Sequence, residues 1–370
     1  MSKPAATADT ADARPTRTIL VAGINTIRRK NLHQFAGLKP YGYRFVVLTA
    51  DSMGRSRELA EGLGNVELFV CHPWWFRLTS LYLLVRILLT RRIHLAEVYP
   101  YAELPLMMVL ILRLARVPVA LIARGEEYNY VTGRMSLRRR LTFRWTYKLA
   151  PYVLYRELYM EPLLREFGTR KAWFLANAVD LPHHVREHRE TGCRFLFLNS
   201  IKHFRHPEVA LEAFLQLCDE LRLAADGPVR LTIVGLQERS ATALDAGKQA
   251  RLRQMVEGRD VPVELHPWSA EPDRWLDDAD VFLLPADVVF LNFSLLEAMA
   301  RGIPPVVQDA PGAERVVTHG ENGYVLPLDV AAWKEHMRRL IHDTTLRAHL
   351  GAAARQTVAD RYSREAYAEQ

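Results

Sequence analysis

The sequence predicts an α/β protein made of two doubly wound parallel sheets, and three observations support this fold class. Short apolar runs alternate with segments of helical character along most of the chain, and strands that alternate with helices form parallel sheets. The chain has 370 residues, which exceeds the usual size of a single core and favours two domains. The segment 181–193 is mostly polar and holds no apolar run. We therefore expect a linker there, between domains at 18–180 and 194–360.

The strands and helices of both domains follow from the apolar pattern. In the first domain we expect strands at 18–23, 44–51, 66–70, 94–99, 117–123 and 152–155. Its helices are expected at 74–89, 104–114, 135–149 and 160–167. In the second domain the predicted strands are 194–199, 229–235, 261–265, 280–285 and 303–307. The predicted helices there are 241–257, 272–279, 294–301, 330–341 and 345–359.

The composition describes a soluble globular protein, with 49% hydrophobic and 25% charged residues. Cys71, Cys193 and Cys218 are scattered without the spacing of metal ligands, so we expect reduced thiols in a cytoplasmic protein. The histidines of the linker have no set of cysteines or carboxylates beside them, and no metal site is expected. Residues 1–17 lack the apolar core of a signal peptide and are expected to be a disordered tail.

Charge divides the chain unevenly, and no membrane span is expected. Residues 1–180 hold 27 Lys and Arg against 14 Asp and Glu, a net charge of +13, whereas residues 181–370 hold 22 against 28. A basic half attracts polyanions or anionic lipid headgroups, although scattered surface arginines explain it equally well. The apolar runs 78–90 and 104–123 are interrupted by arginines and are too short to cross a bilayer.

The segment 280–307 has the pattern of a ligand-binding turn. An apolar strand ends at Pro285, a polar turn follows, and a short helix begins near Ser294. Ser294 is a plausible N-cap because Glu297 stands three residues later, which is capping-box spacing. Gly302 then ends the helix before the next strand. In open α/β sheets, such a turn presents backbone N–H groups and the positive end of a helix to anions.

The letters LLEAMARGIPPVV, followed by PGAERVVTHGENGYVL, resemble the donor-site region of glycosyltransferase family 4. The family pattern is EGFGLxxLEAMAxGxPVV followed by GGxxEhVxxGxNGhLh. The resemblance implies the GT-B fold, in which two Rossmann-like domains face a cleft that closes over the donor. Residues 18–180 would then bind the acceptor and residues 194–360 the nucleotide sugar. Residues 361–370 would be a tail or the start of a helix that crosses back to the first domain.

The resemblance also implies the donor-binding residues. Glu297 would accept hydrogen bonds from the ribose hydroxyls. Arg205 stands where the family lysine grips the pyrophosphate, and arginine can do so bidentately; Lys202 is a reserve cation. The donor base would lie near 266–268. Further candidates are the first glycine after the first strand and the residues at the helix start, namely Gly23, Asn292, Phe293, Ser294 and Leu295.

Several positions depart from the family pattern. Val289 replaces the first glutamate, which commonly contacts the transferred sugar, and Asp287 lies two residues upstream as a substitute. Only Gly23 stands where a glycine-rich loop is usual, and the basic residues 28–30 after it are expected in a solvated loop. These departures leave the nucleotide half of the predicted site intact.

The turn after strand 117–123 holds the candidate catalytic residues. It reads Arg124-Gly-Glu126-Glu127, and Arg124 replaces a histidine of the family. Retaining transfer in the family is described as front-face, with the donor phosphate helping to deprotonate the acceptor, so the histidine is not essential. Glu126 and Glu127 could bind sugar hydroxyls or take up the acceptor proton. Capping of the following segment is an equally good explanation.

The helix predicted at 135–149 is basic and amphipathic. Leu137, Leu141, Trp145 and Leu149 recur every four residues, among five Arg and Lys residues. Such a helix can lie on an anionic membrane surface, or it can pack its apolar stripe on the sheet. We favour packing slightly.

The sequence therefore predicts a retaining glycosyltransferase with a nucleoside-diphosphate sugar as substrate and without a cofactor. Its acceptor would be a glycan or lipid-linked saccharide of a cell-surface polymer. We expect it to work in the cytoplasm, peripherally at an anionic membrane, and not on nucleic acid. Two alternatives remain open: a non-catalytic subunit that binds a nucleotide sugar, favoured by Val289 and Arg124, and a GT-B epimerase.

Overall fold

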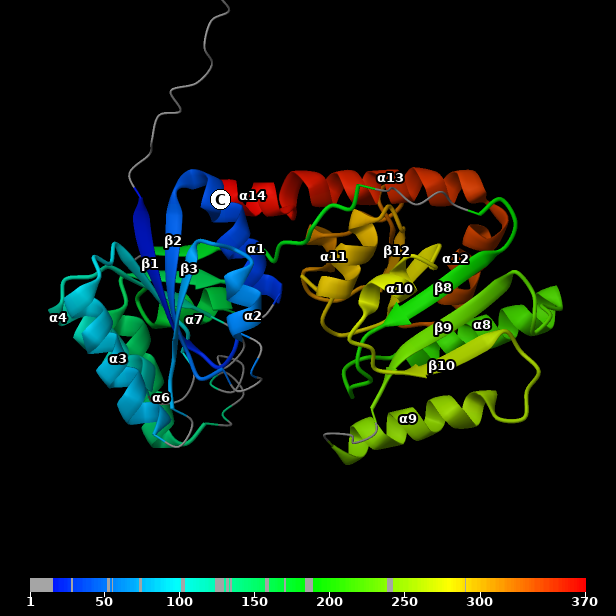
Figure 1. The fold of residues 1–370 in the computed structure, drawn as a ribbon. Helices are drawn as coiled ribbons and strands as arrows, with labels where there is room; N and C mark the ends of the chain where they lie inside the picture. The colour runs from blue at the N-terminus through cyan, green and yellow to red at the C-terminus, as the bar shows by residue number, and fades with distance from the viewer. Residues whose placement is uncertain are drawn as a thin grey trace, which may run out of the picture. The chain divides into compact units, whose positions relative to one another are not determined.

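The computed structural model describes residues 16–370 except 28, 52–53, 55, 73–74, 101–103, 124–129, 131–132, 134, 157–159, 170, 184–188, 238–241 and 290. The chain divides after Leu175 into two compact units, each with its own parallel sheet (Figure 1). Both sheets have helices on their two faces, as the sequence predicted from alternating strands and helices.

The first unit holds a seven-stranded sheet in the order β3-β2-β1-β4-β5-β6-β7, and every described pair is parallel. The strands are β1 (Arg17–Ile24), β2 (Tyr43–Thr49), β3 (Val66–Val70), β4 (Leu95–Val98), β5 (Val119–Ile122), β6 (Tyr152–Tyr155) and β7 (Lys171–Phe174). The helices are α1 (Arg29–Leu38), α2 (Ser56–Glu61), α3 (Phe76–Thr90), α4 (Leu104–Leu114), α6 (Leu137–Leu149) and α7 (Met160–Glu166). A short 3₁₀ turn, η1 (Lys39–Tyr41), follows α1.

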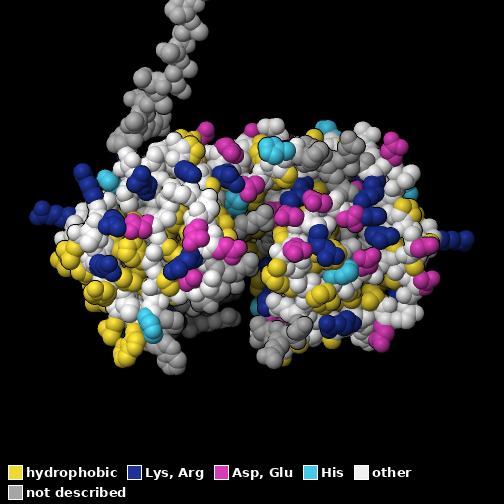
Figure 2. All heavy atoms as spheres, viewed as in Figure 1, with side chains coloured by type: hydrophobic (Ala, Val, Ile, Leu, Met, Phe, Trp, Pro, Cys, Tyr) yellow, Lys and Arg dark blue, Asp and Glu magenta, His cyan; other side chains and the backbone are white. Residues whose placement is uncertain are grey.

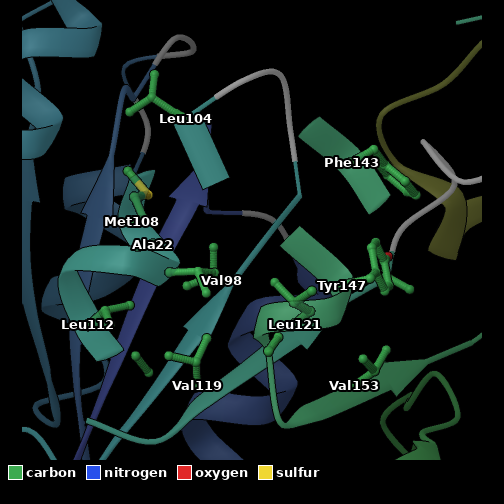
Figure 3. Packing of buried hydrophobic residues seen from close by; sticks show 14 of the residues in the cluster. Ala22, Val98, Leu104, Met108, Leu112, Val119, Leu121, Phe143, Tyr147 and Val153 are labelled. Atoms are coloured by element: carbon green, nitrogen blue, oxygen red, sulfur yellow. The ribbon is translucent and has the colours of Figure 1, made fainter. Parts of the chain in front are cut away.

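Alternating side chains of each strand supply two separate cores in the first unit. On β1, Leu20 and Ala22 join the core beneath α3, α4, α6 and α7, while Ile19 and Val21 join the core beneath α1 and α2. Figure 3 shows the first of these cores, with side chains of α4 and α6 pointing toward those of β4, β5 and β6. This alternation is the period-two pattern of a sheet that is covered on both faces.

The second unit holds a six-stranded parallel sheet in the order β10-β9-β8-β11-β12-β13. Its strands are β8 (Cys193–Leu198), β9 (Val229–Leu236), β10 (Val263–Pro267), β11 (Val281–Leu284), β12 (Pro305–Gln308) and β13 (Tyr324–Leu326). Its helices are α8 (Pro207–Leu221), α9 (Ala243–Val256), α10 (Pro272–Leu276), α11 (Phe293–Ala300), α12 (Val330–His342), α13 (Thr344–Arg361) and α14 (Arg364–Glu369), with a 3₁₀ turn η2 (Ala313–Arg315). Strand order reverses between β8 and β11, which makes their carboxyl ends the topological switch point.

Three sequence expectations differ from the structure. The basic residues after β1 were expected in a loop, but Arg29 and Lys30 begin α1. The stripe of α6 was slightly favoured to pack on the sheet, yet Leu137, Leu141 and Trp145 are 75%, 51% and 54% exposed. The core contacts of α6 come instead from the intervening residues, chiefly Phe143 and Tyr147. In the third case, the segment expected as a linker is attached to the second unit.

Hydrogen bonds attach the described residues of 176–193 to the rest of the second unit, and Cys193 also joins the core of that unit. The hydrogen bonds include Val179 N–H to Tyr362 O at 2.9 Å, Arg355 Nη2 to Pro182 O at 2.8 Å, Arg189 Nη1 to Asp280 Oδ2 at 2.8 Å and Arg347 Nη2 to Arg189 O at 2.7 Å. The unit boundary therefore lies before Ala176 rather than at residue 180. Residues 361–370 were expected to be a tail or the start of a helix, and residues 364–369 form the helix α14. None of the helices in the described part of the chain is long and apolar enough to span a bilayer.

Candidate functional site

The candidate site lies at the carboxyl ends of β8 and β11, where two loops are joined side by side. Arg205, in the loop after β8, forms an antiparallel β-bridge with Ala286, in the loop after β11. On either side of it, the His206 N–H donates to Pro285 O at 2.7 Å and the Asp287 N–H donates to Phe204 O at 3.0 Å. This pairing fixes the Arg205 loop against the segment that leads into α11.

Arg205 is a half-buried cation whose charge is not neutralised. Its Nη1 donates to Ser200 O at 2.6 Å and its guanidinium lies 5.3 Å from the ring centre of Phe204, while its Nε is buried without a partner. No carboxylate of the described residues pairs with it. Burial lowers the pKa of Arg205 to about 10, so the group stays positive near neutral pH. An anion such as a pyrophosphate would complete this environment.

Lys248 supports the backbone that carries Arg205. Its Nζ donates to Arg205 O at 2.9 Å, to His206 Nδ1 at 3.0 Å and to Glu208 Oε1 at 2.5 Å. No short sequence motif links Lys248 on α9 with this loop, and sequence reasoning missed it for that reason. The cluster fixes the loop without using the Arg205 guanidinium.

Lys202, the predicted reserve cation, is already paired. Its Nζ lies 3.4 Å from Asp245 Oδ2 and 3.1 Å from Gln237 Oε1. Burial alone would raise the pKa of Asp245, but the His203 N–H, the Thr242 hydroxyl and the Lys202 charge outweigh it and lower the pKa. The carboxylate therefore stays ionised and neutralises Lys202. Arg205 remains the better-suited of the two predicted cations for binding an anion.

The N-terminus of α11 is capped by Asn292 and not by Ser294. Asn292 has an extended backbone, and its Oδ1 accepts the Leu295 N–H at 3.1 Å, while Ser294 already lies inside the helix. The cap therefore occupies the N–H group of Leu295, one of the candidate donor-binding residues at the helix start. Among the described residues, the Phe293 and Ser294 N–H groups have no protein acceptor. They leave the positive end of α11 available to an anion.

The backbone around the cap is constrained. Leu291 has φ +53°, a region that a non-glycine residue enters only when its surroundings require it. Its carbonyl accepts Asn177 Nδ2 at 2.8 Å, and Asn292 Nδ2 donates to Asn199 Oδ1 at 3.1 Å. Asn199 Nδ2 is buried and without a partner at the end of β8. This second unsatisfied donor, also missed from the sequence, lies beside the cap residue of α11.

The two acidic candidates of this region differ in environment. Glu297 lies on α11 with a side chain 9% exposed, and its contact with a ribose stays a prediction. Asp287 is about half exposed and accepts hydrogen bonds from His206 Nε2 at 2.9 Å and Gln308 Nε2 at 3.2 Å. Val289, at the position of the first family glutamate, is fully buried. An apolar side chain suits the buried position 289. The nearby carboxylate of Asp287 is held at the end of β11 by His206 and Gln308.

An aromatic hollow of about 380 Å³ lies beyond β10, at the edge of the same sheet. It is lined by His266, Pro267, Trp268, Ser269, Ala270, Glu271, Arg274 and Trp275. The Trp268 N–H donates to Leu236 O at 2.7 Å, which anchors this segment to the end of β9. Trp268 is 58% exposed, and the Trp275 ring centre lies 4.5 Å from that of His266. Such a surface can stack a nucleotide base, and it includes the residues that the sequence indicated.

Two motif positions have structural roles. Asn322 Oδ1 accepts the Thr318 N–H at 2.7 Å and its Nδ2 donates to Thr357 Oγ1 at 2.9 Å, so it fixes a turn. Gly23, at the switch point between β1 and β4, has φ +83°, and a Cβ there would lie 2.6 Å from Tyr99 O. Only glycine fits that approach, and donor binding by Gly23 stays a prediction.

The catalytic candidates Arg124, Glu126 and Glu127 lie outside the described residues. Among the residues that are described, no group of three or more His, Cys, Asp and Glu side chains is arranged to hold a metal ion. The three cysteines are buried, and none of them forms a disulfide within the described part of the chain. Burial raises the pKa of Cys71 and raises that of Cys218 to about 11.

Comparison with known proteins gives a family match that lies within the second unit. Residues 183–357 match the family described as glycosyl transferases group 1. D-inositol 3-phosphate glycosyltransferase of Xylanimonas cellulosilytica is 29% identical over 164 residues, which are 43% of this chain and 36% of that protein. Amylovoran biosynthesis glycosyltransferase AmsK of Erwinia amylovora is 36% identical over 63 residues, 15% of this chain and 16% of that protein. The chain spans less than half the length of the curated relatives it matches.

The fold is shared over nearly the whole chain. The crystal structure of Anabaena HepE in complex with UDP aligns with a TM-score of 0.70 at 16% identity, covering 96% of this chain and 98% of that one. This likeness concerns the fold, because the identity is low. The chain thus has the GT-B fold, and its residues 183–357 match the glycosyl transferases group 1 family.

Proposed function

We propose that this protein is a retaining glycosyltransferase that moves a sugar from a nucleoside-diphosphate sugar to a glycan or lipid-linked acceptor. The observation that carries the proposal is the uncompensated Arg205 cation at the switch point of the second unit, on a loop that is bridged to the segment leading into α11. This unit contains the match to the group 1 family. UDP is the first nucleotide to try, because HepE shares the fold and was crystallised with it. A role in cell-surface polysaccharide synthesis is supported by the likeness to AmsK, whose name assigns it to amylovoran biosynthesis.

The proposed chemistry uses the donor site to stabilise the leaving group. The bond between the anomeric carbon and the phosphate oxygen breaks, and an acceptor hydroxyl forms a new bond to that carbon on the same face. The acceptor proton passes to the departing phosphate oxygen. Negative charge grows on the nucleoside diphosphate, where Arg205 and the Phe293 and Ser294 N–H groups would lie. Stabilisation of developing charge by fixed donors is commonly the largest catalytic contribution.

The replacement of the first family glutamate by Val289 concerns recognition of the transferred sugar rather than stabilisation of the leaving group. Val289 cannot bind sugar hydroxyls, so we expect altered sugar choice before loss of chemistry. Asp287 and His206 are the polar side chains at the end of β11 that could contact the sugar in its place. The same loss favours a non-catalytic, nucleotide-sugar-binding subunit as the second candidate function. The observations on the described residues do not favour an epimerase.

The test is nucleoside diphosphate release from a panel of nucleotide sugars, with membrane extract as the acceptor source. We expect one sugar to be turned over, and Arg205→Ala to reduce the rate while Arg251→Ala, on the exposed face of α9, leaves it unchanged. Tight binding of a nucleotide sugar without hydrolysis or transfer would support the non-catalytic subunit. We further propose that the protein works peripherally at the inner face of a membrane, where lipid-linked acceptors are available.

A further inference from the structure

Three neighbouring helices of the first unit are apolar on their outer faces as well as toward the core. α4 packs between α3 and α6, and the inner residues of all three belong to one core. Of the eighteen exposed large apolar side chains among the described residues, eleven lie on these helices or on the residue before α3. We call them the outer apolar face: Trp75, Leu78, Tyr82, Val85, Leu89, Met107, Leu110, Leu114, Leu137, Leu141 and Trp145.

The outer apolar face is a continuous pattern rather than scattered exposure. On α3 its members follow one another at spacings of three and four residues, which places them in one stripe. Leu89 and Leu114 are 82% and 85% exposed. Figure 2 shows apolar side chains gathered over α3 and α4, with Lys and Arg between them. A surface helix of a soluble domain normally has polar residues there, and contiguous exposed apolar residues mark an interaction site.

The charge on these helices has a single sign. α3, α4 and α6 together contain eight Arg and Lys residues and no Asp or Glu. Most are exposed, among them Arg77, Arg86, Arg140 and Arg144. Long basic side chains can extend their charge to lipid headgroups while their stems cover apolar surface. The aromatic rings of Trp75, Tyr82 and Trp145 are the kind that prefers the boundary between headgroups and acyl chains.

We propose that the outer apolar face docks on an anionic phospholipid bilayer, with α3, α4 and α6 lying in the headgroup region. The apolar stripe would enter the acyl boundary and the eight basic residues would neutralise anionic headgroups. A second copy of this chain is a poor occupant, because a two-fold contact would place like charges opposite one another. The inference extends the proposed function by naming the surface that would hold the enzyme beside a lipid-linked acceptor.

The test is flotation of the full-length protein with vesicles of phosphatidylcholine alone or mixed equally with phosphatidylglycerol. We expect binding to the mixed vesicles that weakens as salt rises, and little binding to neutral ones. Replacing Leu89 and Leu114 with Glu should abolish it. Replacing Arg140 and Arg144 with Gln should weaken it by roughly fivefold per residue at low salt. Leu244→Glu is the matched control, since Leu244 is 69% exposed on α9 of the second unit.

A second readout assigns the docking surface directly. Brominated lipid should quench Trp145 and Trp75, so quenching should fall in a variant with both changed to Phe. Trp173→Phe is the control, because Trp173 is 49% exposed on β7. The proposal is overturned if anionic vesicles do not bind, or if the Leu89→Glu, Leu114→Glu protein still floats. It is also overturned if the free protein self-associates and that variant becomes monomeric.

UDP binding, followed by thermal shift, separates this inference from the proposed function. Loss of vesicle binding with unchanged UDP stabilisation in the Leu89→Glu, Leu114→Glu protein supports a docking role for the face. Vesicle binding by a protein that transfers no sugar would retain the docking surface and reject the transferase. Loss of UDP stabilisation in this variant would mean that the substitutions disturb the fold, and would overturn the assignment.

Discussion

Replacing Arg205 with Met should make the unliganded protein more stable and, at the same time, weaken its binding of UDP. Burial lowers the pKa of Arg205 to about 10, well below the ordinary value of a guanidinium. At about 1.4 kcal/mol per pKa unit, keeping this charge costs about 3 kcal/mol. The cost is fully present below the folded pKa, which includes neutral pH. The hydrogen bond to Ser200 O offsets about 1 kcal/mol, and its loss leaves that carbonyl unsatisfied. We expect a net gain of about 1 kcal/mol in the unliganded protein.

The effect on UDP has the opposite sign. Two unit charges about 4 Å apart interact by about 4 kcal/mol at the effective dielectric constant of a protein surface. Desolvation of the diphosphate offsets part of this, so we expect a loss of about 2–3 kcal/mol, or roughly 30–150-fold in the dissociation constant. Uridine carries no phosphate, and its binding should not change. Calorimetric titration with UDP and uridine, together with a thermal melt of the free protein, measures all three quantities.

One pattern of results would contradict phosphate binding by Arg205. If Arg205→Met lowers the melting temperature and weakens uridine as much as UDP, Arg205 stabilises the loop and does not bind phosphate. Arg251→Met, on the exposed face of α9, should change neither the melting temperature nor either affinity.

Three further predictions test the surroundings of the site. Asn292→Ala should cost about 1 kcal/mol of unfolding free energy through loss of the α11 cap, while Ser294→Ala should cost much less; equal effects in urea titrations would contradict the assigned cap. Asp245→Asn should destabilise the protein above about pH 4. Because the pKa of Asp245 is lowered, the difference from wild type should shrink as the carboxylate protonates at lower pH, and a gap that widens in acid would refute this. A Cβ on Gly235 would overlap a backbone carbonyl, so Gly235→Ala should prevent folding or cost several kcal/mol. A Cβ added at Gly247 has no atom within 4 Å outside the adjacent turns of its own helix, so Gly247→Ala should stabilise α9 by about 0.5–1 kcal/mol. Thermal melts of the two glycine variants measure both effects.

Strands were well predicted because buried parallel strands are short apolar runs with clear ends. Five of the six strands of the second unit lie within a few residues of the expected positions, and the strand 152–155 is reproduced at both ends. The strands β7 and β13 were not predicted. The start of α11 was misplaced because Asn292 and Ser294 are both good caps by residue type. The positive φ of Leu291 decides between them, and no sequence pattern revealed it. Short-range sequence signals therefore located the turn before α11 correctly, but they did not identify the residue that caps the helix.

Contacts between distant residues account for the remaining differences. Lys202 is neutralised by Asp245, forty-three residues away, and spacing alone cannot indicate such a pair. The four-residue stripe of α6 was expected to face the core, because apolar periodicity does not say which side of a helix is covered. On α6 the aromatic residues Phe143 and Tyr147 provide the core contacts. A periodic stripe predicted the helix correctly and its buried face wrongly.

Arg347 defines where a fragment that carries the second unit must begin. Its side chain is fully buried, and Nη2 donates to Arg189 O at 2.7 Å and to Gly192 O at 3.2 Å. A fragment that begins at Cys193 would retain the whole sheet yet leave this guanidinium enclosed with two carbonyl acceptors missing. A fragment that begins at Ala176 keeps both carbonyls. Exchange of the second unit between proteins of this fold therefore has a natural crossover point before Ala176, upstream of the apparent linker.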